Sequence, residues 1–285
     1  MAKRTNDTPG PDGVQLSVEE VTTFRRTICG HYREHGRNLL WRSTTDPYHI
    51  LVSEIMLQQT QVERVIEKYQ VFIDLFPGFE ALAQATLRDV LAAWQGLGYN
   101  RRATALKKIG EIVACDCGGI LPSDLDFLTS LPGLGYNTAC ALLAFAFNKP
   151  VVFIETNVRT VFMHFFFSDR GDVRDREILP LVEQTLDLEN PRAWYSALMD
   201  YGTMLKKTHG SINARSAHYQ KQPAFKGSDR QIRGMILRVV IAHRDITQGQ
   251  LVKELQVPAE RARKALSALE KEGFVREAEG RYTIA

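Results

Sequence analysis

Cysteine is scarce in this chain, which has only four among its 285 residues. They are Cys29, Cys115, Cys117 and Cys140. Their spacings fit no zinc site, no four-cysteine cluster and no redox pair of the C-x-x-C kind. We therefore expect ordinary thiols in a reducing compartment, and no bound metal.

Long apolar runs are also absent. The longest covers residues 139–147, and its nine residues are about half of what a membrane-spanning helix needs. Residues 1–12 are polar and contain proline and glycine, so they lack the apolar core of a signal peptide. We expect a cytoplasmic protein that contacts no membrane.

Neither sign of charge dominates, because 36 Lys and Arg stand against 33 Asp and Glu, a net charge of +3. This excess is only a weak hint of an anionic partner. Hydrophobic residues make up 44% and charged residues 24%, values that exclude the disordered and collagen-like classes. The length suits two domains, or one domain with a small appendage.

Apolar residues recur at helical spacing through the first 205 residues or so, for example at Leu51 and Ile55 and at Leu87, Val90 and Leu91. Proline and glycine pairs separate these runs. Convincing alternating strands are absent before residue 274. The pattern predicts a disordered tail over residues 1–17, followed by an all-α domain of many short helices over residues 18–205.

Residues 206–227 form a basic stretch with weak periodicity, which begins with Lys206 and Lys207. From Lys206 to Lys226 it carries five Lys and Arg and no acidic residue. We interpret it as a basic linker, which is either a solvated tether or a strap that faces DNA.

Residues 228–285 are typical of a separate small domain. Amphipathic helices are expected over 232–243, 247–255 and 258–272, followed by two short strands within 274–284. Helix, helix, helix and hairpin is the order of a winged helix-turn-helix, in which the third helix reads the DNA groove. Winged helices also bind proteins, so this alternative stays open.

The segment L-P-G-L-G-Y-N-T-A over residues 131–139 carries the first functional motif. Gly133 and Gly135 lie between apolar helical runs and allow a tight hairpin, whose backbone N–H groups can approach a phosphate. Such contacts position nucleic acid without reading its sequence. The alternative is a structural turn between two helices.

Three further segments accompany the hairpin: S-E-I-M-L-Q-Q-T-Q-V over 53–62, W-Q-G-L-G-Y-N-R-R-A over 94–103 and I-E-T-N-V-R over 154–159. With these motifs the chain resembles the helix-hairpin-helix DNA glycosylases, and within them the endonuclease III and adenine DNA glycosylase branch. Their order and spacing match across roughly residues 38–205. The resemblance implies a helix-hairpin-helix glycosylase domain.

Cleavage of an N-glycosidic bond leaves positive charge on the sugar and negative charge on the departing base, so two carboxylates in different environments suit it. The resemblance assigns these roles to Glu54 and Glu155. Glu54 lies in an apolar helical run, where desolvation is expected to raise its pKa and suit a general acid. Glu155 lies at a helix start, where the alternative is charge complementarity to the helix. Asn157 matches the asparagine that holds this carboxylate.

Several positions depart from the family. Glu155 stands where the superfamily has aspartate, and the extra methylene could shift the carboxylate by more than about 1 Å. Asn137 stands where the glycosylase-lyases have lysine, so no Schiff-base nucleophile is present there. We therefore predict a monofunctional glycosylase, with Asn137 in the catalytic site.

Relatives usually end this domain with a four-cysteine [4Fe–4S] loop, but the corresponding stretch from Met204 onward contains no cysteine. The prediction is an enzyme without an iron-sulfur cluster. The resemblance still allows a monovalent cation at the hairpin. Adenine DNA glycosylases also carry a C-terminal domain that recognises 8-oxoguanine. In this chain the expected winged-helix unit stands in its place.

A glycosylase must flip out its target nucleotide and fill the gap, and by resemblance a glutamine of the Q-Q-T motif, first Gln59, helps to do so. Trp41 is expected near the base pocket, or else in the core. The predicted DNA-binding residues are Gln58, Gln59, Tyr99, Arg101, Arg102, Leu131, Gly133, Gly135, Tyr136, Thr138, Lys206, Lys207, Arg261 and Lys264.

Together these observations predict a monomeric DNA glycosylase of base excision repair, with mismatched or damaged double-stranded DNA as its partner. The first choice of substrate is adenine opposite guanine or 8-oxoguanine. The nearest alternative is uracil, mispaired thymine or another modified or deaminated base. An alternative of another class is a non-catalytic DNA-binding regulator, against which the presence of both Glu54 and Glu155 argues.

Overall fold

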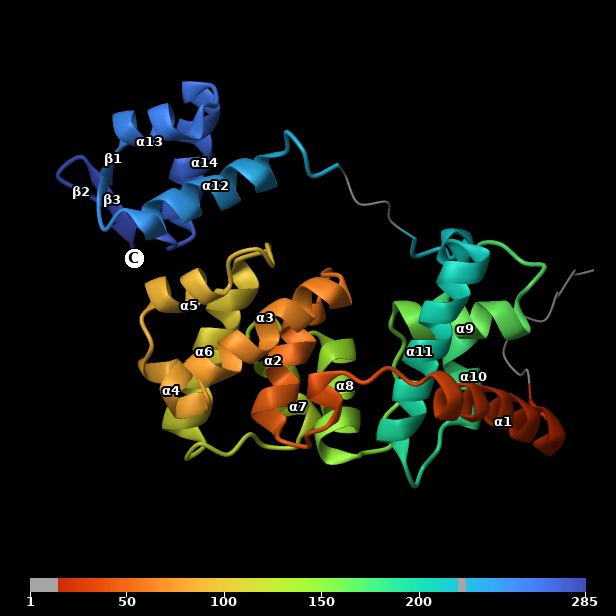
Figure 1. Cartoon of the computed structure of the whole chain (residues 1–285). Helices are drawn as coiled ribbons and strands as arrows, with labels where there is room; N and C mark the ends of the chain where they lie inside the picture. The colour runs from red at the N-terminus through yellow and green to blue at the C-terminus, as the bar shows by residue number, and fades with distance from the viewer. Residues whose placement is uncertain (1–14, 220–223) are drawn as a thin grey trace, which may run out of the picture. The chain divides into compact units, whose positions relative to one another are not determined.

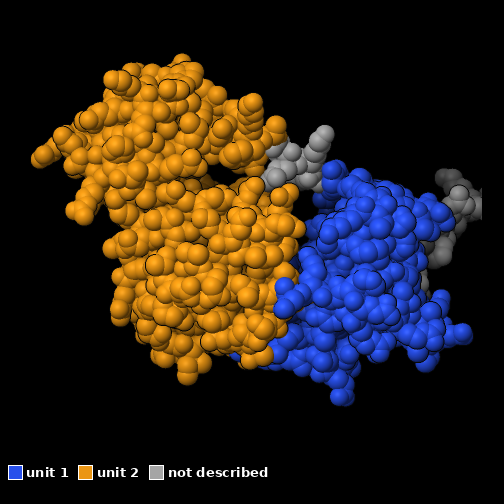
Figure 2. Space-filling model, in the orientation of Figure 1, with its two compact units in different colours: residues 1–38, 136–221 blue, residues 39–135, 222–285 orange. Residues whose placement is uncertain are grey.

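The structure is a computed structural model that describes residues 15–219 and 224–285. These residues form two compact units (Figure 2), and each unit is built from two separate stretches of the chain. Unit 1 comprises the described residues 15–38 and 136–219, and unit 2 comprises 39–135 and 224–285. The predicted all-α fold of the larger domain is confirmed. Among the residues described before residue 220 the regular elements are all helices, and the only β-type pairing is an isolated bridge between Val173 and Ser216.

Unit 1 is a helical bundle around an aromatic core. The ring of Phe24 packs against those of Phe162 and Trp194, with centroids 5.3 and 5.8 Å apart. All three side chains are buried, and rings in such tilted arrangements contribute more than their buried area alone. The elements (Figure 1) are α1 (Val18–His35), α8 (Tyr136–Phe147), α9 (Thr156–Phe166), α10 (Asp175–Thr185), α11 (Pro191–His209) and the 3-10 helix η2 (Ile212–Arg215).

Unit 2 begins with a second group of short helices. Its core contains Phe72 and Trp94, whose rings meet nearly edge to face at 5.8 Å and are fully buried. The elements are the 3-10 helix η1 (Leu40–Arg42), α2 (Pro47–Leu57), α3 (Val62–Leu75), α4 (Phe79–Gln84), α5 (Leu87–Ala93), α6 (Arg101–Asp116) and α7 (Leu125–Ser130).

The C-terminal stretch of unit 2 contains three helices and a small antiparallel sheet of strand order β1-β3-β2. Thr247 caps α13 as expected, because its hydroxyl accepts from the backbone N–H of Gln250. The structure adds strand β1, which the sequence did not indicate. The elements are α12 (Asp229–Ala242), β1 (Ile246–Thr247), α13 (Gln248–Leu255), α14 (Ala259–Lys271), β2 (Val275–Ala278) and β3 (Arg281–Ile284).

Polar contacts connect this C-terminal stretch to α5 and α6 within unit 2. The Arg88 guanidinium donates to the carbonyls of Val240 and Ile241 at 3.1 and 2.8 Å, at the end of α12. These are carbonyls that a helix end leaves unpaired, and a cation there also suits the helix dipole. Glu272 accepts from Arg101 and Arg233 at 2.9 and 2.6 Å.

The predicted boundaries need two corrections. Leu16 is buried and its N–H donates to Gln184 at 2.8 Å, so the end of the predicted disordered tail is ordered, while residues 1–14 lie outside the described residues. α11 runs on to His209, where the N–H of Gly210 caps it by donating to the Lys206 carbonyl, so Lys206 and Lys207 are helical and not part of a linker. Residues 220–223 of that linker are not described. Among the described residues, no helix is long and apolar enough to cross a membrane.

Candidate active site

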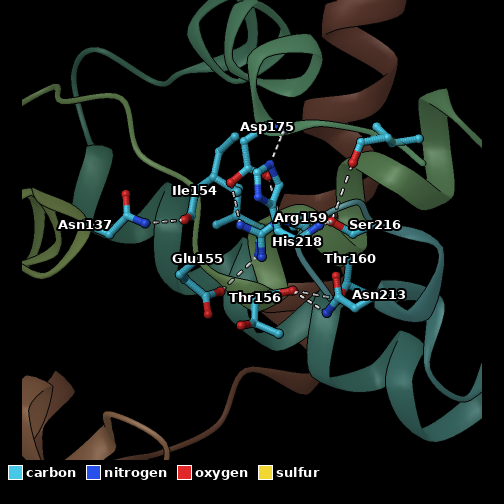
Figure 3. Close-up of polar contacts among 12 residues, drawn as sticks. Asn137, Ile154, Glu155, Thr156, Arg159, Thr160, Asp175, Asn213, Ser216 and His218 are labelled. Atoms are coloured by element: carbon cyan, nitrogen blue, oxygen red, sulfur yellow. Dashed lines mark hydrogen bonds and ion pairs between the residues drawn. The ribbon is translucent and has the colours of Figure 1, made fainter. Parts of the chain in front are cut away.

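Glu155 is the N-cap of α9, and its carboxylate is held by the helix that it caps. Its Oε1 accepts from the backbone N–H groups of Asn157 and Val158 at 2.6 and 3.0 Å. Its Oε2 accepts from Asn157 Nδ2 at 3.4 Å. The helix-start alternative and the catalytic hypothesis therefore do not compete, because capping fixes the carboxylate in one place. Figure 3 shows Glu155 at this helix start.

The surroundings of Glu155 have opposite effects on the pKa of its carboxyl. Burial raises the pKa of the Glu155 carboxyl above its usual range, whereas Lys206, the two backbone N–H groups and Arg159 lower it. Burial has the larger effect, so the net direction is upward. Lys206 and Arg159 thus oppose the effect of burial on this carboxyl.

Asn157 joins α9 to α11. Its side-chain oxygen accepts from Lys206 Nζ at 2.6 Å, and its Nδ2 lies 3.8 Å from the sulfur of Met199. Lys206 was predicted to bind DNA from a linker. The structure instead places its half-buried ammonium on α11 beside Asn157, because α11 continues past residue 205.

The segment after α11 supports the start of α9. Buried Asn213, in η2, donates its Nδ2 to the carbonyl of Thr156 at 2.9 Å and to the hydroxyl of Thr160 at 2.8 Å (Figure 3). Nearby, Arg159 forms a bidentate pair with Asp175, with both N–O distances 2.6 Å. These contacts brace the two turns that carry Glu155, and sequence reasoning missed Asn213.

The hairpin contains the point in the sequence at which the chain passes from unit 2 to unit 1, between Gly135 and Tyr136. Gly133 has φ of 79°, and a Cβ there would meet Ala105 Cβ at 2.9 Å, so both conformation and space require glycine. A Cβ placed on Gly135 would have no neighbouring atom within 4 Å, so space does not require glycine there. Leu131 was predicted to bind DNA; its side chain is buried at the end of α7, and its N–H donates to the carbonyl of Leu128 at 3.3 Å.

Residues 136–138 begin α8 in unit 1. Exposed Asn137 donates its Nδ2 to the carbonyl of Ile154, next to Glu155, at 2.8 Å (Figure 3). Exposed Tyr136 donates its hydroxyl to the carbonyl of Val152 at 3.3 Å. Thr138 is half-buried. The position that resembles the lyase lysine is therefore connected to the residue before Glu155.

Glu54 lies in unit 2, half-buried on α2 between fully buried Ser53 and Ile55. Gln58 caps the end of α2 and Gln59 lies in the following turn with φ of 55°, so neither glutamine is helical. Gln58 Nε2 donates to the carbonyl of Gly133 at 3.3 Å, which connects the Q-Q-T motif to the hairpin, and Gln59 is exposed.

Arg102 was predicted to contact DNA, but the structure surrounds its guanidinium with protein carbonyls. Its guanidinium is buried and donates to the carbonyls of Ile55 and Met56 at 2.8 Å, and to those of Leu97 and Gly98 at 3.1 Å. Burial lowers its pKa to about 10, so it remains charged at neutral pH. Arg102 clamps the end of α2, which carries Glu54, and phosphate would have to compete with these partners.

Three other predicted DNA contacts have protein partners in unit 2. Arg101 pairs with Glu272 at 2.9 Å, Arg261 pairs with Asp229 at 2.8 Å, and the Tyr99 hydroxyl accepts from Arg230. Phosphate would have to compete with these partners. Lys207 and Lys264 are exposed. Trp41 is buried against Tyr69, with ring centroids 5.4 Å apart. These contacts are those of a core residue, which was the alternative to a place near the base pocket.

The residues do not fit a four-cysteine cluster. Cys29 and Cys140 lie in unit 1, whereas Cys115 and Cys117 lie in unit 2. The described residues contain no group of three or more His, Cys, Asp or Glu that could hold a metal ion. In place of a cysteine loop, residues 211–218 offer Asn213 and Ser216, which make hydrogen bonds to protein groups.

Comparisons with known proteins agree with this geometry. Residues 52–184 match the model of the HhH-GPD superfamily base excision DNA repair protein. An adenine DNA glycosylase of Mycolicibacterium smegmatis is 34% identical over 281 residues, which cover 90% of this chain and 94% of that protein. The structure of a thermostable thymine-DNA glycosylase matches with a TM-score of 0.60 at 24% identity, over 69% of this chain and 95% of that chain. A trapped endonuclease III–DNA covalent intermediate matches with 0.52 at 18% identity, over 75% and 93%.

Helical units, a glycine hairpin and a capped carboxylate define a class of DNA repair protein, and the chain belongs to the HhH-GPD superfamily. It is a DNA N-glycosylase of base excision repair, and DNA is its partner. The resemblance drawn from the sequence is thus confirmed at the level of family, fold and enzyme class. The non-catalytic regulator is not supported.

Proposed function

We propose that this glycosylase removes adenine opposite guanine or 8-oxoguanine by hydrolysis, without cleaving the strand. The observation that carries the proposal is the fixed carboxylate of Glu155, held by Asn157 at the start of α9. The relatives named adenine DNA glycosylase favour adenine as the base.

In this mechanism Glu155 faces the sugar, where its negative charge stabilises the developing cation. Glu54 protonates the departing base as general acid. Gln58 and Gln59 fill the space that the flipped nucleotide leaves, and the hairpin N–H groups after Leu131 bind a phosphate. A monovalent cation at the hairpin and the absence of an iron-sulfur cluster are part of the same proposal.

We further propose that residues 228–285 work as a winged helix-turn-helix that adds non-specific DNA affinity. Exposed Lys264 on α14 supplies positive charge for phosphates, and exposed Lys207 on α11, outside this stretch, adds to it. Deletion of residues 228–285 should then weaken binding to undamaged duplex and reduce its salt dependence. Unchanged affinity would favour the protein-docking alternative.

The substrate is tested with a panel of single-lesion duplexes under single-turnover conditions. The panel carries adenine opposite guanine, 8-oxoguanine, cytosine and thymine, together with uracil and thymine mispaired with guanine. Fastest release of adenine opposite guanine or 8-oxoguanine supports the proposal. Preference for uracil or thymine contradicts it.

Strand cleavage is tested on the same products. Because Asn137 offers no amine, the abasic strand should stay intact until alkali or heat is applied. Efficient trapping of a covalent protein–DNA adduct by borohydride would contradict the monofunctional assignment. Loss of such trapping in Lys206→Met would then identify the amine.

A further inference from the structure

We infer that Lys206 is a positioning residue of the excision reaction, one that orients Asn157 and supplies the positive charge beside Glu155. The inference rests on the proposed role of Glu155. It gives the last turn of α11 a function in the reaction, whereas sequence reasoning placed Lys206 in a DNA-binding linker.

The contact fixes the orientation of the Asn157 amide. An ammonium group only donates hydrogen bonds, so the group 2.6 Å from Lys206 Nζ must be the side-chain oxygen of Asn157. The amide nitrogen then points the other way, to Glu155 Oε2 at 3.4 Å. Lys206 thus decides that Asn157 presents a donor to the carboxylate.

One face of α11 is shaped for this contact. Met199, Gly202 and Lys206 follow each other at spacings of three and four residues, which places them on one side of a helix. A Cβ at Gly202 would lie 2.6 Å from the Asn157 carbonyl oxygen and 2.7 Å from Asn157 Cβ. Only glycine lets α11 approach α9 so closely, and this approach brings Lys206 within reach of Asn157.

The charges around Lys206 are few. Glu155 and Arg159 face it from the α9 side, and Arg37 lies near it, paired with buried Asp200 at 2.6 Å. Burial lowers the pKa of Lys206, with Arg159 and Arg37 acting in the same direction and Glu155 against them. Conversely, Lys206 is the strongest of the influences that lower the pKa of Glu155.

The sign of the pH effect follows. If ionised Glu155 stabilises the sugar cation, excision slows as pH falls through the pKa of Glu155. Removing Lys206 leaves burial less opposed, so that pKa rises and the acidic limb of the rate profile moves to higher pH. Opposite charges about 4–6 Å apart shift a carboxyl pKa by about 1–3 units. Asn157 lies between Lys206 and Glu155 and hydrogen-bonds to both, so we expect the low end, a displacement of about one pH unit.

The experiment measures single-turnover excision from pH 4.5 to 9 for wild type, Lys206→Met, Lys206→Arg and Lys108→Met, together with the Kd for lesion duplex. Lys108→Met is the matched control, because exposed Lys108 pairs with Glu111 on the surface of α6. We expect Lys206→Met to displace the acidic limb upward and to slow excision about tenfold below it. Lys206→Arg should restore the wild-type limb, and Kd should change no more than in the control.

An acidic limb at the wild-type pH in Lys206→Met would overturn the inference. So would a slower rate without any displacement of the limb, which a merely structural role would give. If wild type excises no base from the panel, the proposed function fails, and a double-mutant cycle on Tm with Lys206→Met and Asn157→Leu then tests the contact. Additive changes in Tm would overturn it.

Discussion

Two carboxylates are proposed for one reaction, and the protein holds them in different ways. Glu155 is held by hydrogen bonds from backbone N–H groups and from Asn157, beside the ammonium of Lys206. Glu54 lies among the buried apolar residues of α2, whose end is clamped by Arg102. The comparison teaches that the first carboxylate is fixed by the helix that it caps, whereas the second is carried within a helix whose neighbouring residues are buried and whose end Arg102 holds.

The largest effect is expected for Glu155→Gln. The amide oxygen can still cap α9, so the fold should persist, but the negative charge that faces the sugar cation is lost. Excision should fall by at least as much as for loss of a general acid, about 10²–10⁴-fold. Single-turnover rates at saturating enzyme measure this, and affinity for lesion duplex is expected to stay the same or rise.

Glu155→Asp serves as the matched variant, because it restores the usual residue of the superfamily. Aspartate also caps helices well, so measurable activity is expected if the charge, and not its reach, matters. A wild-type rate in Glu155→Gln would remove Glu155 from the mechanism.

Glu54→Gln tests the second carboxylate. The substitution keeps size and most hydrogen bonding but removes the proton that the base would receive, so excision should fall by about 10²–10⁴-fold. Duplex affinity should stay similar. The decline in rate at high pH that is expected for a general acid should vanish in this variant. If that decline persists unchanged, another group protonates the base.

Arg102→Met tests whether α2 is positioned through its clamp. The change removes the Arg102 donor from the carbonyls of Ile55 and Met56. The carbonyls of Leu97 and Gly98 keep hydrogen bonds from the Thr60 hydroxyl and from Trp94 Nε1. Buried polar groups without partners cost about 1–3 kcal/mol each, so the free energy of unfolding should fall by several kcal/mol in denaturant titrations. Arg101→Met, which removes a largely exposed ion pair with Glu272, should cost less than about 1 kcal/mol. Equal losses in both variants would show that the clamp does not support α2.

Much of this fold could be predicted from the sequence, because helical periodicity and turn residues are local signals. Motifs assigned Glu54, Glu155 and Asn157 to the candidate site. The order of the elements and their capping residues indicated the helices and the hairpin of residues 228–285. Strand β1 was missed because two residues give no alternating pattern.

The contacts around the site could not be predicted in the same way. Arg101 and Arg102 are neighbours in one basic motif, yet the first is exposed and the second buried, and only tertiary packing separates them. Asn213 carries no motif at all. The spacing of Gly202 and Lys206 is a helical signal that could have indicated a shared face, had α11 been extended beyond residue 205.

The smallest effect is expected at Glu272, which connects α6 beside the clamp to the C-terminal stretch of unit 2. Arg233 and Arg101 lower the pKa of Glu272 to about 2, below its ordinary 4.5. A lowered folded pKa gives stability that is present above pH 4.5 and is lost as pH falls toward 2. Glu272→Gln should therefore lower Tm at pH 7, and its difference from wild type should shrink as the pH is lowered from 5 to 3. Thermal unfolding followed by circular dichroism measures this. The control is Glu260→Gln, because Glu260 is an exposed residue of α14. A difference in Tm that stays constant over this range would mean that the charge of Glu272 does not support its contact with Arg101 and Arg233.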